Sequence, residues 1–123
     1  LRREVYEEIG GLDPVYVMYS EELDWCRRAK EAGWRVRYVG DTRIIHHGGR
    51  SSEQVQAHSQ IHFHQSKLRY VRKWHGQGSA RLLRVFLLLM FLHQLLLEAA
   101  KGLLRQQRVR AYWQVMRSGL KES

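Results

Sequence analysis

Proline and cysteine are nearly absent from this chain of 123 residues, which contains only Pro14 and Cys26. A single cysteine cannot form an intrachain disulfide, and this fits a reducing compartment. The chain also lacks a low-complexity tract and an internal repeat. Because hydrophobic residues make up 44% of it, the chain is neither a disordered tail nor a fibre.

Acidic residues become scarce after residue 50. Residues 1–50 hold nine Lys/Arg and nine Asp/Glu, whereas residues 51–123 hold twelve Lys/Arg and only Glu53, Glu98 and Glu122. The second half therefore carries the whole net charge of +9. Anionic lipid headgroups or nucleic acid are the natural partners of such a segment, and a solvated basic helix face is the alternative.

An initiating methionine and a signal-peptide pattern are also missing, because the chain begins LRREVYEEIGG. We therefore expect an internal piece of a longer protein.

Local patterns predict helices followed by short strands, then a helical second half. Ser20 is expected to be the N-cap of a helix that ends at Gly33, with three carboxylates in its first turn. Gly76-Gln77-Gly78-Ser79 is expected to break the helical second half. The predicted helices are 2–9, 21–32, 53–75, 80–104 and 106–119, and the predicted strands are 15–19, 34–39 and 43–47.

Two clusters of residues could carry chemistry. In YSEELDWCRR, residues 19–28, three carboxylates lie at a rigid helix start, where a general base could be held beside a hydroxyl. Acids that only complement the helix dipole are the alternative. In HHGGRSS, residues 46–52, imidazoles could bind a metal and the loop could bind phosphate. A hairpin end with one buried and one exposed His is the alternative there.

Taken in order, four segments resemble a known family: RREVYEEIGGLD, MYSEELDWCRR, AGWRVRYV and IIHHGGRSS. They are similar to the C-terminal part of the catalytic domain in family-2 glycosyltransferases, and most similar to bacterial rhamnosyltransferase-like members that build cell-surface polysaccharides. The resemblance covers residues 1–52 closely and residues 53–75 loosely. It implies an α/β fold of the GT-A type over residues 1–52, followed by a basic amphipathic helical extension over residues 53–123.

The resemblance also implies roles for particular residues. Glu22 matches the general base, with Glu21 and Asp24 assigned to positioning and helix-end electrostatics. His46 matches a metal ligand, with His47 as its rival, and the metal would be Mg or Mn. We expect Arg50 and Ser51 to help hold the donor diphosphate. Glu22 departs from the family, which usually has Asp there, and Gly40 stands where the family usually has Pro. The family's Asp-x-Asp motif is absent from this sequence.

Three histidines and one apolar stretch suggest further functions but have ordinary structural explanations. His58, His62 and His64 suggest zinc, but no Cys pair accompanies them, so exposed polar helix positions explain them better. The apolar stretch 85–97 is too short and too interrupted for a membrane span, which needs about 20 apolar residues. Basic helices with Trp and Leu faces suit the membrane interface, and a buried helix against the catalytic domain fits equally well.

The sequence thus predicts an inverting glycosyltransferase that moves a sugar from a nucleotide-diphosphate donor to a hydroxyl of a glycan or lipid-linked acceptor. We expect it to act in cell-surface polysaccharide or glycolipid synthesis, peripherally on the cytoplasmic side of the inner or plasma membrane. We expect no nucleic-acid partner, and no activity from residues 1–123 alone. The rival hypothesis is a non-catalytic basic module that binds membrane or nucleic acid, which would explain the charge but not the two clusters.

Overall fold

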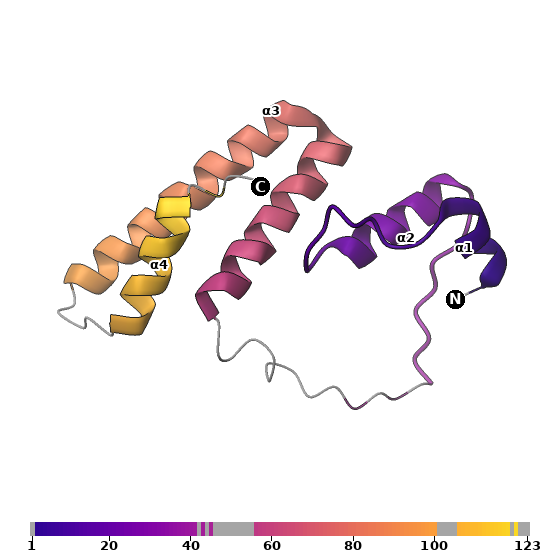
Figure 1. The fold of residues 1–123 in the computed structure, drawn as a ribbon, viewed down its shortest axis with the longest axis horizontal. Helices are drawn as coiled ribbons and strands as arrows, with labels where there is room; N and C mark the ends of the chain where they lie inside the picture. The colour runs from indigo at the N-terminus through magenta and orange to yellow at the C-terminus, as the bar shows by residue number, and fades with distance from the viewer. Residues whose placement is uncertain are drawn as a thin grey trace.

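The computed structural model describes residues 2–41, 43, 45, 56–100, 106–118 and 120, and the structural statements below concern those residues. Their elements in chain order are α1 (Arg3–Ile9), α2 (Glu21–Glu31), α3 (Gln56–Ala100) and α4 (Gln106–Ser118) (Figure 1).

The first two helices begin and end close to the predicted residues. Gly10 follows α1 with φ 74°, and Gly33 lies just beyond α2 with φ 87°. A positive φ is easy for glycine, so both residues let the chain leave its helix. The charge order of α2 matches the helix dipole, with acidic residues in its first turn and Arg28 and Lys30 in its last.

The predicted α/β fold is wrong for the described residues, which contain helices and no strand. Residues 15–19 form turns and bends, and residues 34–39 run without regular structure. A strand requires a neighbouring segment that pairs with its backbone, and the described part of the chain supplies none. The alternation at residues 34–39 also fails to bury one face, since Val36 is 51% exposed and Tyr38 is 96% exposed. Most of the predicted strand at residues 43–47 lies outside the described residues.

Helix α3 is bent into two arms at Gly76, the one residue inside it with non-helical backbone angles (φ 84°, ψ 168°). Figure 1 shows the second arm, residues 77–100, running back from the bend beside the first arm, residues 56–75. The predicted break over residues 76–79 is therefore confined to Gly76, because Gln77, Gly78 and Ser79 are helical.

We expect Gly76→Ala to destabilise this bend. These backbone angles are almost restricted to glycine, and a side chain there costs about 1–3 kcal/mol. Space is not the obstacle, because a Cβ at Gly76 would meet nothing within 4 Å. Gly78→Ala is the matched control, since Gly78 is helical and alanine should stabilise it by up to about 1 kcal/mol. Chemical denaturation followed by circular dichroism measures both, and equal effects of the two substitutions would contradict the assignment of the bend to Gly76.

The hydrophobic core lies where the two arms of α3 meet α4. Its buried members come from the first arm, the second arm, α4 and the residue after it: Leu68, Leu87, Phe91, Val115 and Leu120. Half-buried Ile61, Leu83, Leu88, Tyr112 and Met116 pack around them. This core makes α3 and α4 one packed unit. Helix α2 and the segment before it contact that unit, and α1 contacts α2.

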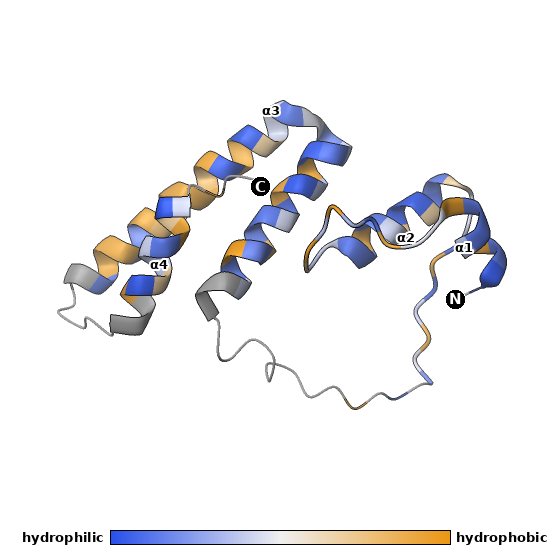
Figure 2. Ribbon diagram, viewed as in Figure 1, coloured by the Kyte–Doolittle hydropathy of each residue, from blue (hydrophilic) through white to orange (hydrophobic). Residues whose placement is uncertain are grey.

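By length and composition, one helix in the described part of the chain, Ser59–Glu98, could cross a membrane. The core helix of a soluble protein passes the same test. Figure 2 shows the apolar residues concentrated in the second arm, while the first arm alternates between polar and apolar residues. The bend at Gly76 divides this helix, so the straight apolar helix that could enter a membrane is the second arm alone.

Candidate functional site

The carboxylates of the first cluster follow a turn with unusual backbone angles. Tyr19 and Ser20 both have positive φ, 69° and 71°, in the left-handed region that non-glycine residues seldom enter. Ser20 occupies the N-cap position of α2, as predicted, but its side chain makes no capping hydrogen bond. Its left-handed backbone explains this, since a capping serine normally has extended angles.

Contacts with the first arm of α3 hold this turn in place. The Tyr19 hydroxyl lies 2.6 Å from the Ser59 hydroxyl, and the Tyr19 ring meets Phe63 edge-on at 5.5 Å between centroids. The Ser66 hydroxyl donates to the carbonyl of Met18 at 2.7 Å. Left-handed angles at non-glycine residues persist only where the surroundings enforce them, and they cluster at functional sites. The start of α2 is therefore a strained, fixed position that can present side chains rigidly.

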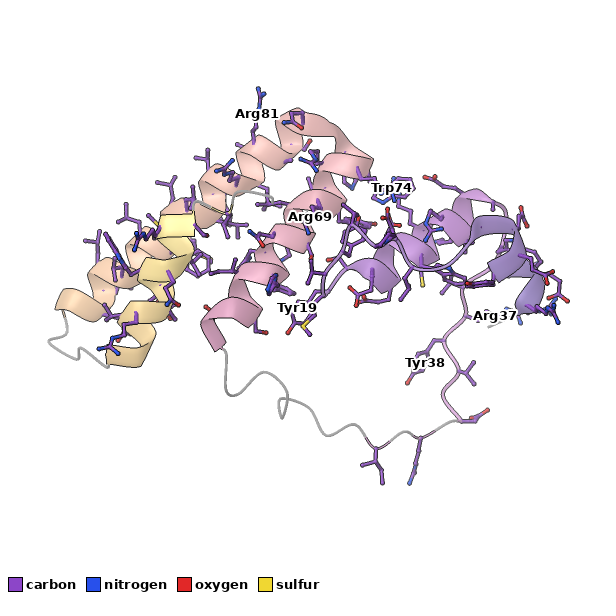
Figure 3. The ribbon with its side chains drawn as sticks, in the orientation of Figure 1. Tyr19, Arg37, Tyr38, Arg69, Trp74 and Arg81 are labelled. Atoms are coloured by element: carbon purple, nitrogen blue, oxygen red, sulfur yellow. The ribbon has the colours of Figure 1, made fainter. Side chains whose placement is uncertain are left out.

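Asp24 is the centre of a buried polar cluster that joins α2 to α3. Its side chain is fully buried and accepts hydrogen bonds from Arg28 at 3.0 Å, Lys73 at 3.0 Å and the Trp74 indole N–H at 2.8 Å. The Tyr16 hydroxyl donates a weaker bond at 3.4 Å. Figure 3 shows Trp74 on α3 directed toward α2. Asp24 therefore connects the candidate catalytic helix to the arm that leads into the bend.

Lys73 and Arg28 extend this cluster to the segment between α1 and α2. The Lys73 ammonium also contacts Asp13 at 2.8 Å, so it bridges two carboxylates. The Arg28 guanidinium donates to the carbonyls of Ile9 and Gly11, which fixes the chain after α1.

The pKa values in the cluster follow from this geometry. Burial acts to raise the pKa of Asp24, but the hydrogen bonds from Lys73, Trp74 and Arg28 outweigh burial and hold that pKa below 3.8. The hydrogen bond from Lys73 likewise lowers the pKa of Asp13. Burial lowers the pKa of Lys73, but its two carboxylate partners outweigh burial and raise the pKa. Both carboxylates and the ammonium are charged at neutral pH.

The other two acidic candidates have different surroundings. Glu22 is exposed on the first turn of α2, where a solute can reach it. Glu21 is half-buried, and its Oε2 is shielded from solvent without a hydrogen-bond partner among the described residues. A shielded carboxylate oxygen without a donor is uncommon in proteins. The three acids therefore differ in the structure. Glu22 is accessible, Glu21 is partly shielded, and Asp24 is buried and hydrogen-bonded.

The second cluster lies outside the described residues. His46, His47, Arg50 and Ser51 all fall between residues 45 and 56, so the structure tests none of their predicted roles. The described residues hold no group of three or more His, Cys, Asp or Glu side chains that could bind a metal.

A cavity of about 820 Å³ lies between α1, α2 and residues 34–39. Trp25, Cys26, Trp34 and three arginines are among its lining residues, and no carboxylate is. The two indole N–H groups are already engaged, since Trp25 donates to the carbonyl of Gly10 and Trp34 to Glu8. This cavity is therefore separate from the accessible carboxylate of Glu22.

His64 differs from the exposed polar position that the sequence predicted. Its ring is half-buried and packs edge-on against Phe63 and Phe91 at 5.2 and 5.1 Å between centroids. Its Nδ1 is buried and has no hydrogen-bond partner among the described residues. Burial, and then the charge of Lys67, lowers the pKa of His64 below 6.5, so the folded protein holds a neutral imidazole.

We expect His64 to make the helical unit less stable in acid. A folded-state pKa below the unfolded value means that the unfolded chain binds the proton more readily. This contribution to stability is intact above pH 6.5 and falls as the pH drops through the folded value, by up to about 1.4 kcal/mol per pH unit. His64→Leu should flatten the dependence of the melting temperature on pH between neutral and mildly acidic buffers. His93→Leu, at an exposed position, is the control. Identical pH profiles for wild type and His64→Leu would contradict this account.

The sequence alone predicted no role at this site for four residues that contact Asp24: Tyr16, Arg28, Lys73 and Trp74. The spacing of Lys73 and Trp74 marks only a basic helix with an apolar face. Nothing in the sequence brings residues 73–74 to residue 24, because that contact depends on how α3 packs against α2. The pair of Arg28 with Asp24 could have been found, since they lie four residues apart on one helix.

Comparisons with known proteins relate the chain to glycosyltransferases. No family model matches it, and no solved structure matches it. Curated proteins of two strains of Mycobacterium tuberculosis, each named N-acetylglucosaminyl-diphospho-decaprenol L-rhamnosyltransferase, are 31% identical over 76 residues. That match covers 62% of this chain and 25% of each relative. The O-antigen biosynthesis protein RfbC of Myxococcus xanthus is 38% identical over 47 residues, covering 38% of this chain and 4% of that protein.

The chain thus spans about a quarter of the length of its mycobacterial relatives. The names of these relatives support the coarse part of the resemblance, which is a glycosyltransferase-like family.

Proposed function

We propose that this chain is the part of an inverting glycosyltransferase that supplies the general base. The enzyme would move a sugar from a nucleotide-diphosphate donor to a hydroxyl of a glycan or lipid-linked acceptor, in polysaccharide or glycolipid synthesis. The relatives support the kind of reaction, since one is named a rhamnosyltransferase of a diphospho-decaprenol and the other an O-antigen biosynthesis protein.

The start of α2 is the observation that carries this proposal. A general base must be held within hydrogen-bond reach of the proton that it removes. The strained turn at Tyr19 and Ser20 is fixed by the first arm of α3, and it leads directly into Glu21 and Glu22. A helix that only needed acids to complement its dipole would not require left-handed angles at two non-glycine residues.

Among the three acids, the geometry favours Glu22 as the base. Asp24 accepts bonds from Arg28, Lys73 and Trp74 and has a lowered pKa, so it is neither accessible nor basic enough to take a proton. Glu22 is exposed and reachable. The Oε2 atom of Glu21 is shielded from solvent, so we assign Glu21 to positioning at the helix start rather than to taking the proton.

The reaction we propose is a single displacement. As the acceptor oxygen attacks the anomeric carbon of the donor, Glu22 takes the hydroxyl proton and the bond from that carbon to the diphosphate breaks. The new glycosidic bond forms on the opposite face, so the anomeric configuration inverts. The nucleoside diphosphate leaves with the electron pair of the broken bond.

The remaining assignments are carried by the resemblance. We propose that the reaction depends on Mg or Mn, with His46 or His47 as a ligand, and that Arg50 and Ser51 contact the donor diphosphate. We also propose that the enzyme works peripherally on the cytoplasmic side of the membrane, where a lipid-linked acceptor would be located.

Release of nucleoside diphosphate tests the proposed function. The full-length enzyme that contains this chain is incubated with a panel of nucleotide-diphosphate sugars, with and without an acceptor and a divalent metal. We expect release with one donor and a strong increase when acceptor is added. A folded full-length protein that releases nothing from any donor would contradict a transferase function.

A further inference from the structure

The second arm of α3 carries an apolar face that no other part of the described chain covers. One side of this arm packs into the core through Leu87 and Phe91. Eight large apolar side chains elsewhere on it are exposed: Leu82, Val85, Phe86, Leu89, Met90, Leu92, Leu96 and Leu97. Leu82, Leu89 and Leu96 are 74%, 59% and 60% exposed and recur every seven residues, so they lie on one side of the helix. We call these eight residues the apolar face.

The apolar face offers a partner almost no hydrogen bonds. Within residues 82–97, His93 is the polar residue whose position along the helix places it on the same side as the apolar face. Interfaces between proteins carry a polar rim and about one hydrogen bond per 100–200 Å². Hydrocarbon requires no hydrogen bonds, so the composition of the apolar face suits lipid better than a second protein surface.

The charge of the second arm and α4 points to the kind of lipid. Residues 77–118 contain seven Lys/Arg and a single acid, Glu98. Arg81 lies at the start of the second arm, on its exposed surface (Figure 3). Arg110 and Trp113 of α4, which packs against α3, are also exposed. Basic residues bind anionic headgroups, and tryptophan is enriched where headgroups meet hydrocarbon.

The first arm contributes less of its charge to such a surface than its sequence suggests. Arg69 is buried and donates to the carbonyl of Val15 at 2.8 Å, and Lys73 bridges Asp13 and Asp24. These two cations stabilise the contact of the first arm with α2 and with the segment before it. Within the basic second half of the chain, the cations left to bind a membrane are therefore those of the second arm and α4.

From these observations we propose that the apolar face is a docking surface for an anionic lipid bilayer and enters one leaflet without crossing it. The uncharged stretch between Arg84 and Glu98 is about 20 Å long as a helix, whereas the hydrocarbon core is about 30 Å thick. This inference extends the proposed location and does not depend on the proposed transfer reaction.

A bilayer on the apolar face would also be linked to the candidate site. Lys73 and Trp74 hold Asp24 of α2 and lie within three residues of the bend that leads to the second arm. A bilayer bound to the apolar face is therefore kept at a fixed position relative to Glu22. A lipid-linked acceptor could then be presented to the same carboxylate in each reaction cycle.

Vesicle flotation of the full-length protein tests this membrane docking. The assay involves no turnover, so the docking proposal can fail independently of the proposed function. The probes are vesicles of phosphatidylcholine alone and of phosphatidylcholine mixed with phosphatidylglycerol. We expect binding to the mixed vesicles that weakens with salt. Leu89→Glu combined with Leu96→Glu should reduce binding about tenfold or more, because two exposed apolar side chains lose their burial in lipid. Circular dichroism checks that this variant stays helical, as expected for exposed positions.

The matched control is Gln77→Glu combined with Ser79→Glu, which adds the same charge at exposed positions outside the apolar face. It should bind nearly as well as wild type. Equal loss of binding in both double variants would overturn the proposal, because charge alone would then explain it. Binding that resists both salt and carbonate would overturn it in favour of a membrane-spanning helix. A dimer that Leu89→Glu dissociates while vesicle binding persists would assign the apolar face to a second copy of the chain.

Discussion

Asp24→Ala is expected to destabilise the chain by about 3 kcal/mol, at the lower end of the cost of breaking a buried ion pair. The substitution leaves the cations of Arg28 and Lys73 and the Trp74 indole N–H without their common acceptor. We expect a cost at the lower end of that range because the Lys73 side chain is 34% exposed, so water can replace part of its lost interaction with Asp24. Urea denaturation followed by tryptophan fluorescence and circular dichroism measures the change.

Glu22→Ala is the control for this prediction. Glu22 lies on the same helix turn but is exposed, so its removal should change stability by no more than about 0.5 kcal/mol. The pH dependence adds a second check. Because the folded pKa of Asp24 is depressed, its contribution is present above pH 3.8 and is lost as the pH falls through the folded value. If Asp24→Ala and Glu22→Ala unfold at the same urea concentration, Asp24 does not hold α2 to α3.

Glu22→Gln in the full-length enzyme is expected to reduce turnover by about 10²- to 10⁴-fold. Glutamine has nearly the same shape but cannot accept the acceptor proton. Donor binding and the melting temperature should stay close to wild type, because Glu22 is exposed. Steady-state kinetics beside donor titration separates a loss of kcat from a loss of binding.

Matched variants at the neighbouring acids complete that experiment. Glu21→Gln should lower turnover much less than Glu22→Gln, since Glu21 is assigned to positioning and not to proton transfer. Asp24→Asn should lower stability together with activity. Normal turnover in Glu22→Gln, with turnover lost in a stably folded Asp24→Asn, would show that the base is Asp24.

Local signals in the sequence predicted the helices well, because they depend on neighbouring residues. The glycines at positions 10 and 33 end α1 and α2 through their own backbone freedom. The charge order of α2 could likewise be recognised from its residues. The predicted strand at residues 34–39 was wrong, since alternation there reports only a capacity for pairing, and the described residues provide no partner.

The candidate site was predicted in part for a similar reason. The cluster of Glu21, Glu22 and Asp24 is visible in the sequence, but their different burial and hydrogen bonding are not. That difference arises because α3 places Lys73 and Trp74 against Asp24, about fifty residues away in the chain. Ser20 shows the same limit, since its sequence marks an N-cap whereas contacts made by Tyr19 and Met18 set its backbone angles.

The anomeric configuration of the transferred sugar tests the central claim most directly. A labelled sugar is transferred from its nucleotide-diphosphate donor to an acceptor by the full-length enzyme, and the product is examined by nuclear magnetic resonance before it can equilibrate. A single displacement assisted by one carboxylate base predicts a glycosidic bond of configuration opposite to that of the donor. A product that retains the donor configuration would contradict the account, because one base at the start of α2 cannot produce it.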